Sequence, residues 1–194
     1  MGLTILILGL LVFLATHVFV TMREARAATI AKLGLNTYRV LFSIVSLGSL
    51  ALIVWGFGEY RAHGAIYVWS PPGFMRHITV ALMLPAVILV VAYFIPSHIK
   101  AKAKHPLLAA AKTWALAHLL SNGDLGAILM FGVFLAWGVY ARIAAKRRGD
   151  LGTTTAPAGY TNDIIVVVVG IVVYLALGYA FHPAVIGVPA FGRA

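Results

Sequence analysis

Apolar residues gather in six runs separated by short polar stretches, and this pattern predicts helices that cross a membrane. The runs are Gly2 to Met22, Val40 to Phe57, His77 to Ile95, Leu107 to Ser121, Leu125 to Ala141 and Asp163 to Phe181. A spanning helix needs about 20 apolar residues, with a lower limit near 17. The fourth run falls short, but it reaches this length if the helix begins in the region 104–106, because proline is tolerated in a first helical turn. The alternative for the fourth run is a re-entrant or interfacial helix.

Basic residues alternate between the connections, and this alternation favours six crossings. The odd connections contain Arg23, Arg26, Lys32 and Arg39, then Lys100, Lys102 and Lys104, then Arg142, Lys146, Arg147 and Arg148. The second connection has only Arg61 and Arg76, and the turn 121–124 has no base. Because basic loops stay in the cytoplasm, the odd connections are predicted to be cytoplasmic. We therefore expect an all-α, polytopic transmembrane helix bundle of about six helices, a single domain over 1–194, with both termini on the outer, periplasmic side.

The composition agrees with a membrane protein. Of the 194 residues, 62% are hydrophobic and 10% are charged, whereas a soluble domain carries about 25% charged residues. The net charge of +10 is explained by the basic loops, so the predicted partner is the lipid bilayer and not nucleic acid. There is no cysteine, which excludes disulfides and thiolate metal sites.

Acidic residues offer little for catalysis. The five are Glu24, Glu59, Asp124, Asp150 and Asp163, and none is central in an apolar run. A paired-carboxylate site for general acid–base chemistry, or a carboxylate proton relay, is therefore not expected. The pairs Gly132 with Gly138 and Gly170 with Gly178 are interpreted as helix-packing positions.

Histidine is the remaining residue type with site chemistry. His63 and His182 are predicted to lie in outer connections, His77 at the outer start of the third helix and His98 just past its inner end. That leaves two histidines inside predicted spans and one, His105, at the inner start of the fourth helix.

His17 and His118 lie within apolar runs, where a polar side chain must find a partner. One reading is an interhelical hydrogen bond to a serine of the second helix, where Ser43, Ser46 and Ser49 are available. The other reading is a ligand site, with Trp114 one turn before His118 on the same face. The two histidines are expected to differ in depth by roughly 10 Å at 1.5 Å per residue, a gap that a tilted or short fourth helix closes. His105 is the competing partner for His17.

Four segments carry a family resemblance. They are "ATHVF", "NTYRVLFSIVSLGSLALI", "PPGFMRHITVALML" and "HIKAKAKHPLLAAAKTWALAHLLSNGDLGAILMFG". Together they resemble the NnrU family of bacterial membrane proteins over residues 1 to about 142, and His105 to Asp124 is the most specific part. That family is associated with the expression of nitrite and nitric oxide reductases in denitrifiers. It is also similar to 15-cis-zeta-carotene isomerase, a membrane haem b protein.

This resemblance implies haem b ligated by histidine in a multi-pass protein of the bacterial inner membrane. The matching iron ligands are His17 and His118, with His105 as a third candidate. Trp114 would then pack beside the macrocycle. Lys112 and the Tyr38-Arg39 pair are candidate partners of the propionates, although Lys112 can also extend to the cytoplasmic surface. The isomerase-like group also uses a nearby thiol, which a chain without cysteine cannot supply.

A second resemblance concerns membrane methyltransferases. "KHPLLAA" and "YARIAAKRRGD" are similar to their cofactor segments, an Arg-His-Pro-type turn and an arginine followed by a glutamate pair. Here Arg142 is followed by Ala144, Ala145 and Lys146, so the acids are missing.

The sequence thus predicts a haem b protein of the NnrU type with redox or isomerase-like chemistry, linked to the nitrite and nitric oxide reductase system. The alternatives are a cofactor-free assembly or scaffold factor for denitrification enzymes, and a methyltransferase-like enzyme.

Overall fold

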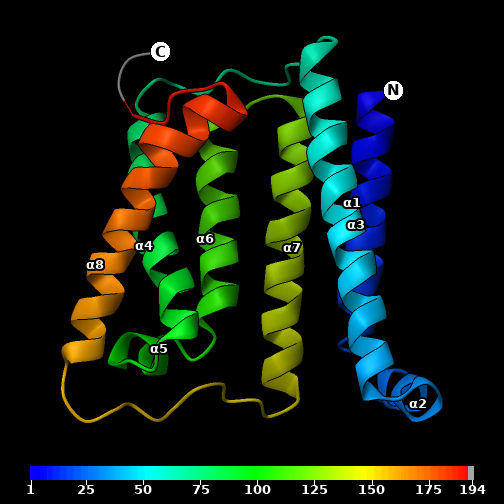
Figure 1. Ribbon diagram of the computed structural model, residues 1–194. Coiled ribbons are helices and arrows are strands. Elements are labelled where there is room, and N and C mark those ends of the chain that lie inside the picture. Colours follow the sequence, from blue (N-terminus) through cyan, green and yellow to red (C-terminus); the bar gives the residue numbers. More distant parts are fainter. Residues whose placement is uncertain (192–194) are drawn as a thin grey trace. The chain divides into compact units, whose positions relative to one another are not determined.

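The computed structural model describes residues 1–191, and this part of the chain is built from helices joined by short connections (Figure 1). In chain order they are α1 (Gly2–Phe19), α2 (Arg23–Leu33), α3 (Leu35–Ala62), α4 (Met75–Phe94), α5 (His98–Ala103), α6 (Pro106–Ser121), α7 (Leu125–Arg147), α8 (Thr161–Ala176) and the π-helical segment η1 (Leu177–Ile186). The all-α prediction is confirmed.

The chain forms two compact units. The first contains residues 1–70 and 122–144, and therefore α1, α2, α3 and most of α7. The second contains residues 71–121 and 145–194, and therefore α4, α5, α6, α8 and η1. Each unit combines segments that are far apart in the sequence.

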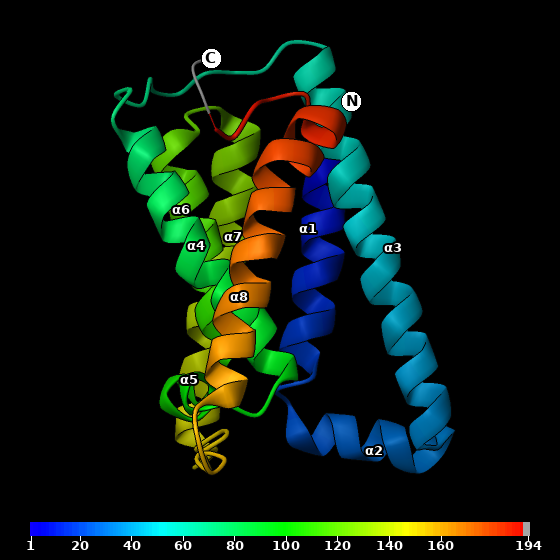
Figure 2. The ribbon, with the colours of Figure 1, turned by 60° about the vertical axis from the view of Figure 1, so that its left-hand side comes forward.

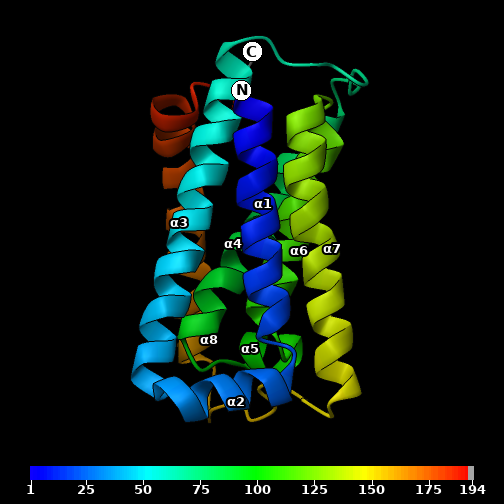
Figure 3. The ribbon, with the colours of Figure 1, turned by 90° about the vertical axis from the view of Figure 1, so that its right-hand side faces the viewer.

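In the first unit, α1 and α3 lie side by side (Figure 3). Leu6, Leu10 and Phe13 of α1 form a core with Ile53 of α3, and α7 adds partly buried side chains that include Trp137. The close approach depends on glycine. A Cβ at Gly56 would collide with the Leu6 backbone nitrogen, and one at Gly2 with the Tyr60 nitrogen. Small residues allow such close packing in membranes, where van der Waals contact replaces the hydrophobic effect between helices.

The predicted first connection is not a loop. Residues Arg23–Leu33 form α2, which runs across the ends of α1 and α3 (Figure 2). It has no buried residue, and Arg23, Arg26 and Lys32 are spread along it with Thr29 and Ile30. A short polar helix at the end of spanning helices is typical of the membrane interface. The sequence did not predict this helix, because its basic residues were interpreted only as a sign that the connection is cytoplasmic.

In the second unit, α4 packs against both α6 and α8 (Figure 1). The Thr79 hydroxyl near the start of α4 donates to the Ala117 carbonyl near the end of α6 at 2.7 Å, so these helices are antiparallel. The Tyr174 hydroxyl of α8 donates to the Val80 carbonyl at 3.0 Å. Gly170 faces Ile88, whose Cγ1 would lie 2.7 Å from a Cβ there. The predicted packing role of Gly170 is thereby supported, whereas no atom of the described chain lies within 4 Å of a Cβ at Gly132.

Five helical stretches among residues 1–191 are long and apolar enough to span a membrane: Gly2–Phe19, Leu35–Ala62, Met75–Phe94, Leu125–Arg147 and Thr161–Ile186. The predicted fourth run is α6, a helix of 16 residues and therefore about 24 Å long. It falls below the usual spanning length. Yet α6 packs antiparallel to α4, with its end beside the start of α4. The chain therefore runs back along α4 before α7 begins.

Contacts between connections agree with the predicted topology. The turn after α6 pairs with the segment after α3 through the bridge between Tyr67 and Asp124, and the Val68 N–H donates to the Gly123 carbonyl at 2.8 Å. On the basic side, the Thr153 N–H after α7 donates to the Lys104 carbonyl after α5 at 2.9 Å. The two base-poor connections therefore meet each other, and two of the basic ones do the same.

The chain ends follow the same pattern. Gly2 packs against the end of α3 at Tyr60. An Arg76 guanidinium nitrogen at the start of α4 donates to the Pro189 carbonyl at 2.6 Å. Gly2 therefore lies near the end of α3, and Pro189 lies near the start of α4. That these helix ends are periplasmic stays a prediction.

Candidate functional site

His17 lies near the end of α1 in an aromatic surrounding contributed by all three long helices of the first unit. Its ring stacks on Phe13 with centroids 3.9 Å apart and planes 23° apart. Phe42 of α3 and Trp137 of α7 each lie 5.4 Å from it, centroid to centroid. The half-buried imidazole therefore lies among aromatic rings. Such a surrounding suits a histidine that binds a flat, apolar cofactor.

The His17 ring is held in one orientation by its own helix. Its Nδ1 lies 2.8 Å from the Phe13 carbonyl oxygen, and only the protonated Nδ1 can donate to that oxygen. In the neutral ring, Nε2 then carries the lone pair. The serine contacts considered from the sequence are not made: Ser49, for example, donates to the Ser46 carbonyl of α3 itself.

Buried polar atoms of the first unit lack hydrogen-bond partners. Among residues 1–191, no partner exists for three buried donors, which are Trp137 Nε1, the Tyr38 hydroxyl and Arg26 Nε. The Arg26 guanidinium carbon lies 5.4 Å from the Tyr38 ring centroid. Two of the three donors therefore belong to neighbouring side chains. A buried polar atom without a partner costs about 1–3 kcal/mol and calls for an explanation such as a ligand or water.

A cavity of about 290 Å³ opens beside these residues and is lined by Thr16, Phe19, Thr29, Leu33, Tyr38, Leu41, Phe42 and Val45. Its lining residues come from α1, α2 and α3. Tyr38 lines it. Arg39 is exposed, and the cation beside Tyr38 is Arg26 of α2. The sequence reading missed Arg26 because the helix that carries it was taken for a loop.

His118 lies in the last turn of α6, in the second unit. Its Nδ1 is 2.9 Å from the Trp114 carbonyl oxygen, the same bond to the preceding turn that His17 makes. The Trp114 ring lies 5.5 Å from it, centroid to centroid. The expected proximity of Trp114 and His118 is thus present.

The prediction that His182 lies in a solvated outer connection is wrong. It belongs to η1, where the helix that begins at Thr161 continues as a π-helix. Its ring lies 6.3 Å from that of His118, centroid to centroid, with planes 26° apart. Its Nδ1 is buried and has no hydrogen-bond partner within the described chain. The apolar run extends past Phe181 to Ile186, and that length was the signal available in the sequence.

His105 lies at the start of α6 and Lys112 lies within it, both on the N-terminal side of His118. His105 directly precedes α6, and the Ala109 N–H donates to its carbonyl at 3.0 Å. The His105 side chain faces the connection after α7, with Nε2 3.3 Å from the Asp150 carbonyl oxygen. Lys112 is half-buried and lies about two turns further along.

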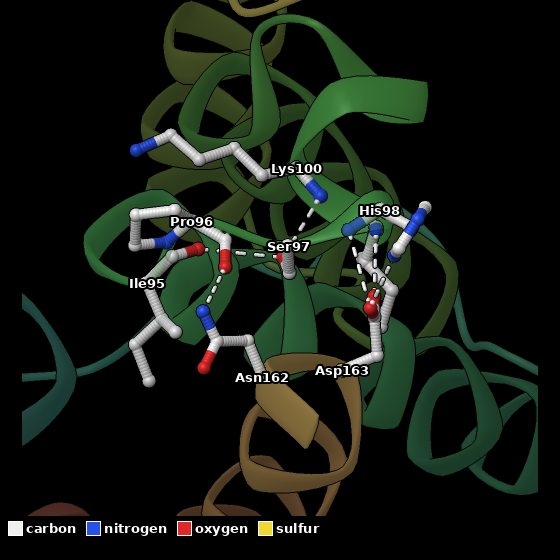
Figure 4. A network of polar contacts seen from close by, with 8 residues as sticks. Ile95, Pro96, Ser97, His98, Lys100, Asn162 and Asp163 are labelled. Carbon is white, nitrogen blue, oxygen red and sulfur yellow. Dashed lines mark hydrogen bonds and ion pairs between the residues drawn. The ribbon is translucent and has the colours of Figure 1, made fainter. Parts of the chain in front are cut away.

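His98 takes part in a junction between α5 and α8 (Figure 4). The Asp163 carboxylate accepts from the Ile99 N–H at 2.9 Å and lies 2.8 Å from His98 Nδ1. The Tyr160 ring stacks on His98 at 4.5 Å. Beside it, the Asn162 amide donates to the Pro96 carbonyl at 2.7 Å. These contacts fasten α8 to the connection that follows α4, which is a structural role.

Over the part of the chain that the structure describes, no three histidine, aspartate or glutamate side chains come together as a metal site. Among the described histidines inside helices, His118 and His182 have neighbouring rings.

Comparison with known proteins supplies the family. The NnrU family model, described as "NnrU protein", matches residues 5–190. The chain belongs to the NnrU family. The match extends through α8 and η1, well beyond the part of the chain, up to about residue 142, in which the resemblance is visible by eye. His17, His118 and His182 all lie within the NnrU region.

No curated protein and no solved structure matches the chain.

Proposed function

We propose that this NnrU-family chain is a haem b protein of the bacterial inner membrane, with His17 and His118 as the iron ligands. The observation that carries the proposal is shared by both residues. Each ring donates through Nδ1 to the carbonyl one turn earlier, which leaves Nε2 as the lone-pair nitrogen. Histidines that bind metals commonly have the other ring nitrogen fixed in this way. Each ring also lies against an aromatic side chain.

The residues around His17 fit such a group. A porphyrin is a flat apolar ring with two carboxylates, so it needs apolar walls and donors at one edge. Phe42 and Trp137 supply walls. Arg26 and Tyr38 supply unsatisfied donors at one place, and a carboxylate between them would satisfy both. We assign the propionate contact to Arg26 and Tyr38, with Lys112 of α6 as a further cationic candidate.

The residues around His118 fit as well. Trp114 lies against the ligand ring and offers a broad apolar face. His182 stands beside His118 with one ring nitrogen unsatisfied. Haem supplies one-electron redox chemistry when bound, and its axial ligands and pocket polarity tune it. If His17 and His118 both held the iron, no iron position would be left open for a substrate, which would favour electron transfer or redox sensing. NnrU membership then supports a role in the nitrite and nitric oxide reductase system.

Absorption spectroscopy tests this proposal. The detergent-purified protein is expected to show a Soret band, with near-stoichiometric haem in a pyridine haemochrome assay. His17→Ala and His118→Ala should each abolish or strongly shift the band. His63→Ala is the matched control, because His63 also bonds through Nδ1 to the carbonyl one turn earlier, Glu59, but at an exposed helix end.

Folding is followed in the same samples by circular dichroism and size-exclusion chromatography. A folded protein that stays colourless after haem supplementation would overturn the haem proposal and favour a cofactor-free assembly factor. Retention of the band in both His17→Ala and His118→Ala would assign the iron to other residues.

A further inference from the structure

A second cavity lies at the basic end of the second unit. It has a volume of about 440 Å³ and is lined by residues of α4, α5 and α6 and of the connection after α7. Lys100, Lys104 and His105 contribute its basic groups, and Tyr93 and Leu107 contribute apolar surface. We propose that this cavity binds the phosphate of an anionic membrane phospholipid. This inference does not depend on haem binding.

The two lysines are placed by specific contacts. Lys100 Nζ donates to the Tyr93 carbonyl at 2.6 Å and lies 5.6 Å from the centroid of that ring. An ammonium has three N–H groups, so two remain for a phosphate. Lys104 lines the same cavity and is exposed, and no hydrogen bond or ion pair of its ammonium is present within residues 1–191.

Lys104 also has a backbone conformation that the surrounding structure imposes. It has φ +62° and ψ −50°, and it is the one non-glycine residue with positive φ among residues 1–191. Such a conformation is unfavourable for a residue with a Cβ. It is held on both sides: the Lys104 N–H donates to the Lys100 carbonyl, and the Lys104 carbonyl accepts from Thr153. Residues kept in rare backbone conformations often mark functional positions.

The connection after α7 forms the opposite wall. A Cβ at Gly152 would collide with the Lys104 carbonyl oxygen and lie 2.8 Å from His105 Nε2, so this wall fits closely. Asp150 also lines the cavity. Its carboxylate is turned to its own loop, where Oδ1 accepts from the Gly152 N–H at 2.9 Å, and it lies 3.9 Å from His105 Nε2. The cavity lining therefore contains two lysines and one carboxylate, and that carboxylate is already hydrogen-bonded within its own loop.

The apolar part of the lining indicates a lipid instead of a free anion. Tyr93 is 43% exposed in the last turn of α4, and Leu107 is 44% exposed in the first turn of α6. At the end of a spanning helix, such residues lie where acyl chains meet head groups. Lysines beside them attract anionic lipid, and basic pockets between membrane helices bind such head groups.

The experiment compares lipids and variants by thermal denaturation and by native mass spectrometry of the full chain in detergent. Phosphatidylglycerol is expected to raise the melting temperature and to remain bound, whereas phosphatidylcholine is not. Lys100→Ala and Lys104→Gly should each weaken phosphatidylglycerol binding about fivefold, as expected for one lysine near an anionic surface. Lys102→Ala, on the same short helix but outside the cavity lining, is the matched control.

Lys104→Gly separates binding from folding. Glycine tolerates positive φ, so this variant should melt at a higher temperature than the unaltered chain without lipid while gaining less from phosphatidylglycerol. Equal lipid stabilisation in Lys104→Gly, Lys100→Ala and the control would overturn the site. If inorganic phosphate stabilises the protein as much as phosphatidylglycerol does, a soluble phosphate is the ligand and the lipid assignment is wrong.

Discussion

The imidazoles of His118 and His182 face each other across the end of α6 and η1, with ring centroids 6.3 Å apart and planes inclined by 26°. His118 is oriented by its bond to the Trp114 carbonyl, whereas the buried Nδ1 of His182 has no partner in the described chain. His182 therefore stands next to the proposed iron ligand with one buried ring nitrogen that has no hydrogen-bond partner in the described chain.

The first prediction concerns this pair. His182→Ala should leave haem bound at near-stoichiometric level while shifting the reduction potential, because it changes the polarity next to the His118 ring. Redox titration followed at the Soret band measures both. His118→Ala should instead remove the band. If His182→Ala removes haem and His17→Ala does not, His182 is the second ligand in place of His17.

Replacing Gly56 tests the α1–α3 contact. Gly56→Ala should destabilise the protein by about 1–3 kcal/mol, the usual cost of overpacking, because its Cβ would collide with the Leu6 backbone. Gly58→Ala is the control on the same helix, since a Cβ there would meet no described atom within 4 Å beyond its own stretch of α3. That change should be neutral or stabilising by up to about 1 kcal/mol. Unfolding in mixed micelles measures both, and equal destabilisation would contradict the close packing.

The hydroxyl of Thr79 ties α4 to α6. Thr79→Val should lower the free energy of unfolding by about 1 kcal/mol, within the range for interhelical hydrogen bonds in membranes, because the bond to the Ala117 carbonyl is lost. Thr79→Ser keeps the hydroxyl and should retain that bond, at the smaller cost of one methyl group in a position only 8% exposed. A larger loss for serine than for valine would show that packing and not the bond matters.

The α5–α8 junction gives a local prediction. Asp163→Ala should lower the free energy of unfolding, because Ile99 and His98 lose their charged acceptor. Hydrogen exchange should accelerate at the amides of α5. Asn162→Ala, which removes one bond to the Pro96 carbonyl, should cost about 1 kcal/mol and leave α5 protected. Unchanged exchange in Asp163→Ala would mean that α5 is held by other contacts.

Much of the fold follows from patterns that are local in the sequence. The apolar runs predict the long helices, because a spanning segment must satisfy its backbone internally and expose apolar side chains along its whole length. The basic residues predict which connections share a face, and the contacts between Tyr67 and Asp124 and between Thr153 and Lys104 agree. His17 and His118 were identified as candidates because each interrupts an apolar run.

The candidate site could not be fully predicted from the pattern of apolar residues. Arg26 was missed because α2 is too short and polar to produce an apolar run, and His182 because the helix continues through Pro183 as a π-helix. The glycines were only partly predicted: Gly170 meets Ile88, but the tight contacts of Gly2 and Gly56 give no sequence signal.

The sequence alone therefore determined the all-α class, the positions of the long apolar helices and the two histidines within apolar runs, since a bilayer selects for composition residue by residue. Only the tertiary structure decided which polar side chains meet, namely Arg26 with Tyr38, His118 with His182 and Lys104 with the connection after α7. These pairs join segments far apart in the chain. Their proximity depends on helix packing and backbone geometry, which no single segment specifies.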